Sequence, residues 1–198
     1  ECFSFMKEFG PFYKWGTGGG FSTIYGQGAL PVRNYTTNIF QEHERMNGQY
    51  LRSHFQVRPR PCFKCRMAHV KEVTVTEGPY KGFTAEEPEY EQIAAWGPQI
   101  GNTDLGGAVL LAHEVDRLGM DCNEASWCVG WAMECYEKGR LDPSQTEGLE
   151  LNWGNVEAVR ELLARISRRQ GFLGELLAEG VMRAAKRLGG EPQEWAIH

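Results

Sequence analysis

The stretch TDLGGAVLLAHEVDRLGMDCNEASWCVGWAMECYEKG, residues 103–139, decides the fold because it holds two helix patterns in succession. Asp104 is typical of a helix cap, and apolar residues recur after it at helical spacing as far as about Leu118. Asn123 is expected to begin the next helix, and Gly139 to end it. Two successive helices joined by a short turn predict a helical domain.

The residues that follow continue the helical pattern. Asn155 is expected to cap a third helix that ends at Gly171, and Leu173 to Leu188 are expected to form a fourth. Apolar residues form one stripe along each of these helices, which predicts a shared core rather than a binding surface.

Residues 1–102 differ, because Gly, Pro and aromatic residues interrupt them and few periodic runs are long. The alternation from Val70 to Val75 predicts a short strand or one arm of a hairpin. We therefore predict a mainly α fold: an irregular multi-helical domain with a glycine-rich, loop-rich first half and at most a short β-hairpin. Residues 1–102 and 103–198 are expected to be two halves of one domain of a longer chain.

The composition is that of an ordinary globular protein. The chain has 198 residues, of which 41% are hydrophobic and 24% charged, which excludes disorder and suffices for one packed core. The formal net charge of -5 argues against nucleic acid as a partner. We predict no transmembrane segment, because no apolar run approaches the roughly 18 residues that a membrane helix needs. The 24 glycines predict a backbone that passes close to another segment or to a ligand.

The first candidate site is the Cys62-Phe63-Lys64-Cys65 motif. Two thiols at this spacing on a tight turn can bind one zinc ion or one iron–sulfur cluster, and can also form a redox disulfide or simply be buried. His69 follows in the pattern C-x2-C-x3-H, and imidazole can replace a thiolate as a ligand. His69 is therefore either a third ligand or a surface histidine.

The second candidate site is the acidic run Glu86-Glu87-Pro88-Glu89-Tyr90-Glu91. It is either a solvated turn or the source of a general acid/base, and nearby aromatic residues favour partial burial. A third candidate is Asp116-Arg117-Leu118-Gly119-Met120-Asp121, where two carboxylates on either side of a glycine could accept hydrogen bonds from a bound heterocycle. The run Gly16–Gly20 lacks the Lys-Ser/Thr of a phosphate loop and is expected to be a tight packing turn.

Taken in order, these motifs resemble the tungsten-containing aldehyde ferredoxin oxidoreductase family over nearly the whole chain. The segments that carry the resemblance are WGTG (15–18), GALPVRNY (28–35), PCFKC (61–65), EPEYE (87–91), GPQIGNTD (97–104), DRLGMD (116–121), AMECYEKG (132–139) and LAEGV (177–181). The resemblance implies that the chain is the middle, helical domain of a larger protein. That protein would hold tungsten or molybdenum between two pterins, with a [4Fe-4S] cluster nearby.

The resemblance also implies roles for individual residues. Asp116, Gly119, Met120 and Asp121 match the motif that binds one pterin, with Met120 in place of leucine. Glu91 matches the glutamate proposed near the metal, and Tyr90 lies beside it. Cys62 and Cys65 match two cluster cysteines, and His69 stands in place of the third. Either its imidazole binds an iron or that ligand has been lost, and the fourth cysteine would lie in another domain.

The function implied is the interconversion of aldehydes and carboxylic acids with electron transfer to ferredoxin or to an electron-transfer subunit. One alternative is the tungsten subunit of an aromatic acyl-CoA (benzoyl-CoA-type) reductase, with an acyl-CoA substrate. An alternative of another class is a non-catalytic structural or binding module with a metal knuckle at the cysteines. The other partners implied are the remaining domains of the same polypeptide, and the expected setting is cytoplasmic and anaerobic.

Overall fold

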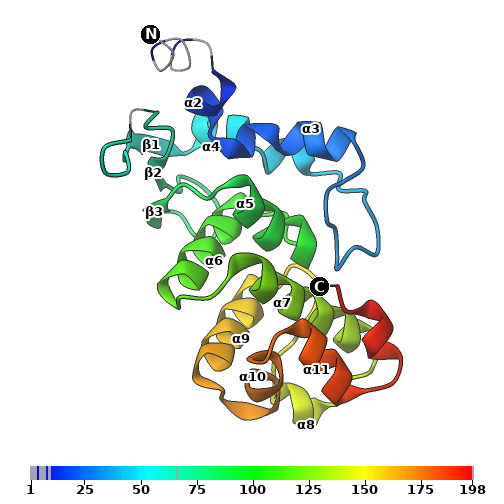
Figure 1. The fold of residues 1–198 in the computed structure, drawn as a ribbon. Helices are drawn as coiled ribbons and strands as arrows, with labels where there is room; N and C mark the ends of the chain where they lie inside the picture. Colours follow the sequence, from blue (N-terminus) through cyan, green and yellow to red (C-terminus); the bar gives the residue numbers. More distant parts are fainter. Residues whose placement is uncertain (1–3, 5–7, 9, 66, 198) are drawn as a thin grey trace.

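The computed structural model describes residues 4, 8, 10–65 and 67–197 of the chain. It is mainly helical, as predicted, and its elements stack in layers, with the first part of the chain at the top and the later helices below it (Figure 1). None of the helices in the described part of the chain is long and apolar enough to cross a bilayer.

The upper layer is built from short helices and a small sheet. Its helical elements are α2 (Pro11–Trp15), η1 (Thr17–Gly20), α3 (Phe21–Gly26), η2 (His43–Arg45) and α4 (Gly48–His54). The strands are β1 (Gln56–Pro59), β2 (Lys71–Thr74) and β3 (Thr84–Glu86). They pair antiparallel in the order β1-β2-β3, so the expected hairpin arm is the central strand of a three-stranded sheet.

The glycine-rich run at 16–20 is a tight packing turn, as expected. A Cβ on Gly18 would lie 2.8 Å from Cδ1 of Ile93 and 3.4 Å from Cα of Gly48. The backbone of η1 therefore packs directly on α4, at a distance that only glycine allows.

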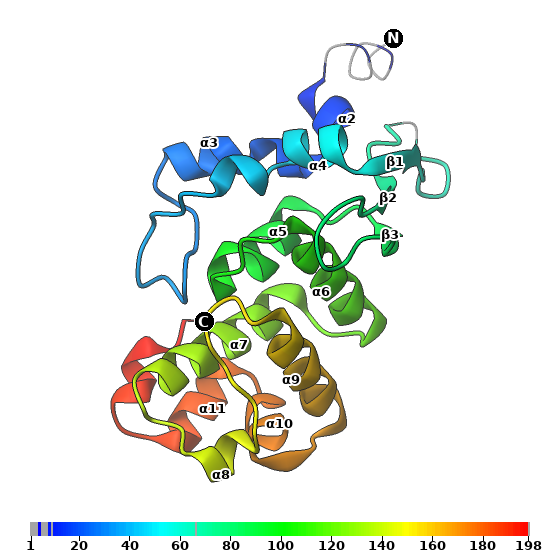
Figure 2. The same ribbon diagram turned by 180° about the vertical axis from the view of Figure 1, so that it is seen from behind.

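The middle and lower layers hold the long helices and most of the core. They are α5 (Tyr90–Trp96), η3 (Pro98–Ile100), α6 (Leu105–Arg117), α7 (Cys122–Glu137), α8 (Pro143–Thr146), α9 (Val156–Arg168), α10 (Gly171–Leu177), α11 (Val181–Leu188) and η4 (Glu191–Trp195). Figure 2 shows from behind how α9, α10 and α11 pack below α6 and α7. One continuous buried cluster runs from Phe21 in the first half to Ala185 in the second.

Three helix boundaries differ from the prediction. Helix α7 begins at Cys122, because the Asp121 side chain accepts from the Glu124 N–H and so takes the capping role expected of Asn123. Helix α9 ends at Arg168 and is closed by Arg169, whose φ is 51°, so Gly171 begins α10 instead of ending α9.

The predicted fourth helix is divided into α10 and α11 by Gly180, whose φ is +86°. A Cβ there would lie 2.7 Å from Oε1 of Glu124, which accepts a hydrogen bond from the Val181 N–H at 2.6 Å. The Glu124 carboxylate of α7 therefore caps α11. Glu124 and Val181 are far apart in the sequence, so the local pattern of apolar residues cannot predict this break.

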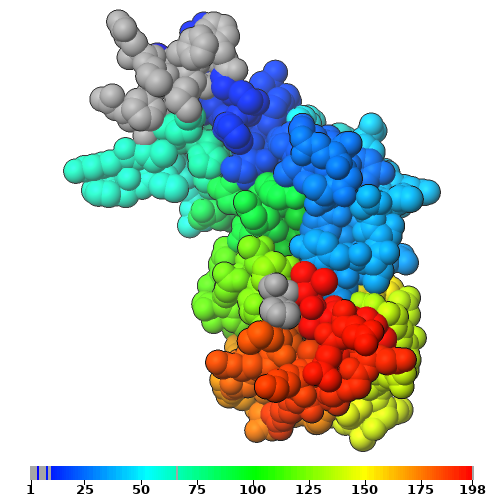
Figure 3. Space-filling view, turned by 45° about the vertical axis from the view of Figure 1, so that its right-hand side comes forward, coloured from blue at the N-terminus to red at the C-terminus, as the bar shows by residue number. Residues whose placement is uncertain are grey.

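The two halves of the chain also meet at the C-terminal end. The loop after α3 descends to the C-terminal segment (Figure 3), where Asn34 donates from Nδ2 to Oε2 of Glu134 at 2.6 Å and to the carbonyl oxygen of Trp195 at 2.8 Å. Asn34 and Glu134 are both 3% exposed. The division at residue 102 is therefore bridged by buried polar contacts as well as by the core.

Candidate functional site

The first turn of α5 carries Tyr90 and Glu91 and is held from outside the helix. The Thr17 hydroxyl donates to Oε2 of Glu89 and accepts from the Tyr90 N–H at 2.8 Å. The Glu89 N–H donates to Oε1 of Gln92 at 3.0 Å. The Thr17 hydroxyl thus bonds both the Glu89 carboxylate, which caps α5, and the first N–H of the helix. These two bonds fix the orientation of the first turn of α5.

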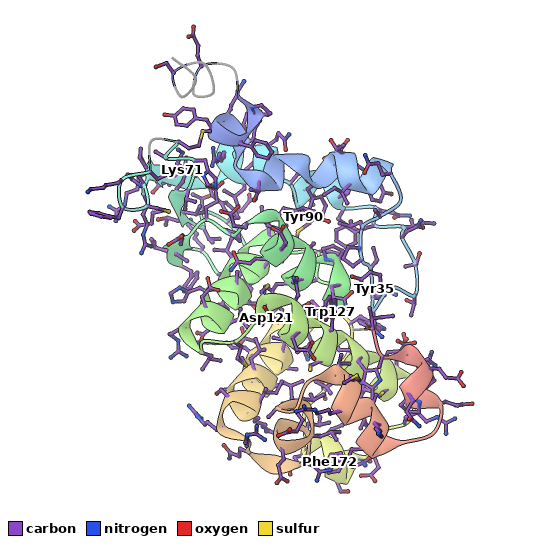
Figure 4. All side chains as sticks on the ribbon, viewed as in Figure 1. Tyr35, Lys71, Tyr90, Asp121, Trp127 and Phe172 are labelled. Atoms are coloured by element: carbon purple, nitrogen blue, oxygen red, sulfur yellow. The ribbon has the colours of Figure 1, made fainter. Side chains whose placement is uncertain are left out.

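Tyr90 and Glu91 line a cleft of about 220 Å³ between α5, α7 and the loop after α3. Tyr35 and Trp127 supply two more aromatic walls, and Figure 4 shows the three rings on one side of the molecule. Burial, together with the charge of Glu91 and the presence of Tyr35, raises the pKa of Tyr90. The phenol is therefore a neutral hydrogen-bond donor at neutral pH, next to an exposed carboxylate.

Gln99 also lines this cleft, and the sequence analysis did not single it out. Its side chain is fully buried, and within the described part of the chain neither its amide nitrogen nor its amide oxygen has a hydrogen-bond partner. A buried amide without partners costs free energy. The sequence signal was a polar residue between Pro98 and Ile100, at a point where the neighbouring residues are apolar.

The DRLGMD segment (116–121) forms the turn between α6 and α7. Gln92 donates to both carboxylate oxygens of Asp116, at 3.1 and 3.0 Å, which ties this turn to α5. Asp121 uses Oδ1 to cap α7, at 2.8 Å from the Glu124 nitrogen. Gly119 has a φ of +69°, and a Cβ built on it would meet no atom within 4 Å.

The chemistry of this turn would suit a pterin. Asp116 and Asp121 are exposed, and an ionised carboxylate has about four lone-pair positions, so each retains acceptors for ring N–H groups. The open space above Gly119 leaves its backbone accessible. Met120 is half-buried and packs against the core, so it supports the turn from below.

The structure brings the predicted carboxylates to one end of three helices. Cys122 begins α7 at this end, and its pKa is raised to about 12, mostly by burial and further by the charges of Asp116, Asp121 and Glu91. This thiol is therefore protonated and unreactive at neutral pH. The three carboxylates that act on it form one acidic surface, of which Glu91 faces the cleft.

The cysteine motif lies in the loop between β1 and β2. Cys62 is exposed and Cys65 half-exposed, and both are free thiols. The Cys65 N–H donates to the Cys62 carbonyl at 3.0 Å, which closes the tight turn that the spacing predicted. Two free thiols on one turn fit the ligands of a metal site or cluster.

His69 follows the cysteines, but its ring contacts a carboxylate. Nε2 of His69 lies 3.2 Å from Oε1 of Glu89. Among the described residues no three His, Cys, Asp or Glu side chains are grouped closely enough to hold a single metal ion. A cubane cluster places its ligands farther apart, because each protein ligand binds a different iron.

One glutamate of the acidic run is structural. Glu87 is buried, and the Arg52 guanidinium bonds it through Nε at 2.7 Å and Nη2 at 2.6 Å. Arg52 also donates to the carbonyl oxygens of Tyr13 and His69, at 2.8 and 2.6 Å. Arg52, which the sequence analysis missed, thus fixes the end of the cysteine loop against α2 and the acidic run.

The fold and site together define a helical domain with an acidic surface beside a cleft and a loop that carries two free thiols. The chain belongs to the aldehyde ferredoxin oxidoreductase family, because the family model described as "Aldehyde ferredoxin oxidoreductase, domains 2 & 3" matches residues 5–198.

Individual relatives agree with this membership. The chain is 32% identical over 182 residues to a tungsten-containing aldehyde ferredoxin oxidoreductase of Pyrococcus furiosus, which covers 89% of this chain and 28% of the relative. It is 31% identical over 192 residues to an aliphatic sulfonate oxidoreductase, WOR-like subunit, of the same organism, covering 94% of this chain and 30% of the relative. The chain thus spans less than a third of the length of these relatives.

A solved structure shares the fold. It is the active site complex BamBC of benzoyl coenzyme A reductase in complex with 1,5-dienoyl-CoA, with a TM-score of 0.61 and 22% identity. The likeness covers 83% of this chain and 24% of that chain. At this identity it shows the fold alone.

Proposed function

We propose that the chain is the middle part of a tungsten- or molybdenum-containing bis-pterin oxidoreductase that interconverts aldehydes and carboxylic acids. The observation that carries the proposal is the position of Tyr90 and Glu91 on a cleft beside the acidic turn of residues 116–121. Family membership and the tungsten-containing relatives support it.

The residues have distinct roles in this proposal. Asp116 and Asp121 would accept hydrogen bonds from one pterin, and the turn at Gly119 and Met120 would hold it. Cys62, Cys65 and His69 would hold a [4Fe-4S] cluster. When bound, the metal–pterin group supplies two-electron chemistry, and the cluster carries electrons singly towards ferredoxin or an electron-transfer subunit.

The protein's own groups manage the protons of the reaction. Conversion of an aldehyde and water to an acid releases two protons and two electrons; the electrons would pass to the metal–pterin group and the electron acceptor, and Glu91 is the base that accepts a proton in the cleft. Tyr90, kept protonated by its raised pKa, orients the substrate oxygen by donating a hydrogen bond. Cys62 is a free and exposed thiol, and a cluster bound beside it would be open to oxidation, which favours an anaerobic, cytoplasmic setting.

The test is substitution of Glu91 in the full-length protein. Glu91→Gln keeps the shape but removes the base, so we expect a loss of roughly 10²–10⁴-fold in kcat with an aldehyde and a viologen acceptor. Glu150→Gln is the matched control, because Glu150 is exposed on a loop that does not line the cleft. The kcat of this variant should equal that of the unmodified protein. If the two variants had equal kcat, Glu91 could not be the base of the reaction.

Two other functions are tested with the same preparation. The shared fold of benzoyl coenzyme A reductase favours an aromatic acyl-CoA substrate as the second candidate, and turnover of benzoyl-CoA without turnover of aldehydes would establish it. The third candidate is a non-catalytic metal knuckle at Cys62 and Cys65. Metal analysis that finds stoichiometric zinc, without tungsten or molybdenum, would favour the knuckle and exclude the enzyme.

A further inference from the structure

We infer that Tyr35 determines which aldehydes the cleft accepts, and that the cleft prefers an aldehyde whose carbonyl carbon is attached to an aromatic ring. The inference rests on the proposed function, because it concerns the substrate of the proposed reaction. It adds Tyr35 as a specificity-determining residue and Asn34 as the residue that positions it.

The cleft is small, and its large apolar residues are all aromatic. Its volume of about 220 Å³ is below the roughly 300–1,000 Å³ of pockets that bind drug-sized ligands. The rings of Tyr35, Tyr90 and Trp127 line it, and the other apolar lining residues are small: Ala29, Pro31, Ala94 and Ala95. Glu91 lines the same cleft beside Tyr90, so a substrate whose carbonyl group they contact has its substituent among these rings.

Two of the three rings have no aromatic partner within the described part of the chain. Tyr90 packs edge-on against the buried Phe21, with ring centroids 6.1 Å apart. Among the described side chains, no ring contact involves Tyr35 or Trp127. Aromatic rings attract one another beyond the effect of the buried area. The unpaired rings on the cleft therefore favour an aromatic ligand over a saturated ligand of the same size.

The backbone at Tyr35 is strained and is held in place by other segments. Arg33, Asn34 and Tyr35 have φ values of 44°, 52° and 61°, a left-handed conformation that residues other than glycine rarely adopt. Such residues persist only where the surrounding structure holds them, and they gather at ligand sites. The position of Tyr35 is therefore set by its neighbours in the fold and not by local preference.

Asn34 provides the anchor of this turn. Its side-chain amide donates to Oε2 of Glu134 at 2.6 Å and to the Trp195 carbonyl oxygen at 2.8 Å. Its backbone N–H donates to the Gln99 carbonyl oxygen at 3.1 Å. Asn34 is 3% exposed, so water does not compete for these bonds. Asn34 is thus a positioning residue that acts on the substrate only through Tyr35.

The experiment compares two product acids as ligands of the full-length protein by isothermal titration calorimetry. Benzoate and cyclohexanecarboxylate share the carboxylate and the ring size, but only benzoate is aromatic. We expect benzoate to bind about 2–10-fold more tightly, which corresponds to the energy of one aromatic pair. Equal affinity for the two acids, or no binding of either, would overturn the inference.

Substitutions of Tyr35 test its role. Tyr35→Leu keeps an apolar side chain without the ring, so the two affinities should approach each other. Tyr35→Phe keeps the ring and should keep the preference for benzoate. Phe12→Leu is the control, because Phe12 is 54% exposed and does not line the cleft. An undiminished preference in Tyr35→Leu would exclude the role of Tyr35.

Asn34→Gly tests the positioning role. Glycine adopts the φ of 52° readily but lacks the anchoring amide, so the preference should fall as in Tyr35→Leu. A loss of folded protein lowers the number of binding sites and leaves the ratio of the two affinities unchanged, so the ratio distinguishes positioning from stability. Asn38→Gly, on the exposed part of the same loop, is the control. An unchanged ratio in Asn34→Gly would exclude the positioning role.

Turnover with a viologen acceptor separates this inference from the proposed function. The kcat/KM for benzaldehyde should exceed that for cyclohexanecarbaldehyde, and Tyr35→Leu should reduce the difference. Equal kcat/KM values for the two aldehydes would overturn the inference. Oxidation of neither aldehyde, by protein that still binds benzoate more tightly than cyclohexanecarboxylate, would overturn the proposed function.

Discussion

Gly48 is the position in the first half where a side chain is least tolerated. A Cβ there would lie 2.3 Å from the Trp15 carbonyl oxygen and 2.8 Å from the Gly19 nitrogen, both of them backbone atoms that cannot rotate away. We expect Gly48→Ala to destabilise the protein by about 1–3 kcal/mol, as overpacking does.

Thermal unfolding of the full-length protein measures this effect. Gly20→Ala is the matched control, because the new Cβ would meet nothing within 4 Å. An equal melting temperature for the two variants would mean that η1 and α4 are not in contact.

Arg52 is the second residue whose loss should be costly. Its partner Glu87 has a side chain 6% exposed, so Arg52→Ala leaves a carboxylate buried without its cation. We expect a loss of about 3–5 kcal/mol, since removal of one member of a buried pair leaves the other uncompensated.

Arg58→Ala is the comparison, because that side chain is 75% exposed in its pair with Glu72 and such pairs contribute about 0–1 kcal/mol. The midpoints of chemical denaturation give both values. Similar midpoints for the two variants would contradict the buried role of Arg52.

The acidic run shows what sequence can decide at the residue scale. Its composition predicted either a solvated turn or a catalytic carboxylate, and the structure divides these roles among its members. Glu87 is buried on Arg52, Glu89 holds the start of α5, and Glu91 faces the cleft. Only the three-dimensional partners distinguish them, because Arg52 and Thr17 are far away in sequence.

At the scale of elements, Asp121 has two roles that can be separated. It caps α7 through one oxygen, and we propose that the other binds pterin. Asp121→Asn keeps a capping side chain, so stability should change by only a few tenths of a kcal/mol. If the carboxylate binds the cofactor, the tungsten and pterin content of the purified protein should nevertheless fall several-fold.

Asp142→Asn provides the control for this prediction. Asp142 caps α8 in the same way, through the Ser144 and Gln145 amides, and lies in a different part of the chain. This variant should keep its full cofactor content. A cofactor content equally low in both variants, or equally high, would show that the charge of Asp121 is not used in binding.

The helices themselves were largely predictable, and their ends were less so. Local signals place the starts of α6 and α9 correctly, because Asp104 and Asn155 each cap an N–H within three positions of themselves. The break at Gly180 depends on Glu124 from another helix. An apolar stripe continues through such a break, so periodicity alone predicts one helix where there are two.

For the whole molecule, we expect the described part of the chain to unfold as one unit, because the core and the Asn34–Glu134 contact span both halves. Asn34→Asp places a second carboxylate beside the buried Glu134 and should cost about 1–3 kcal/mol. Both residue types tolerate the φ of 52° at this position.

Circular dichroism in the far and near ultraviolet tests this prediction. Asn38→Asp, on the exposed part of the same loop, should have little effect. If the two signals gave separate transitions in the unmodified protein, the division at residue 102 would be a domain boundary.

The order of the small sheet has a consequence for how the protein meets its surroundings. β1 is an edge strand whose residues are all exposed. The free edge of such a strand can pair with a strand of another protein molecule and so lead to aggregation. Pro59 offers no amide hydrogen there, and Arg58 sets a charge on the same edge. Pro59 and Arg58 thus disfavour pairing of β1 with a strand of another molecule. We therefore expect a partner protein that binds near the cysteine loop to contact side chains and not to add a strand to the sheet.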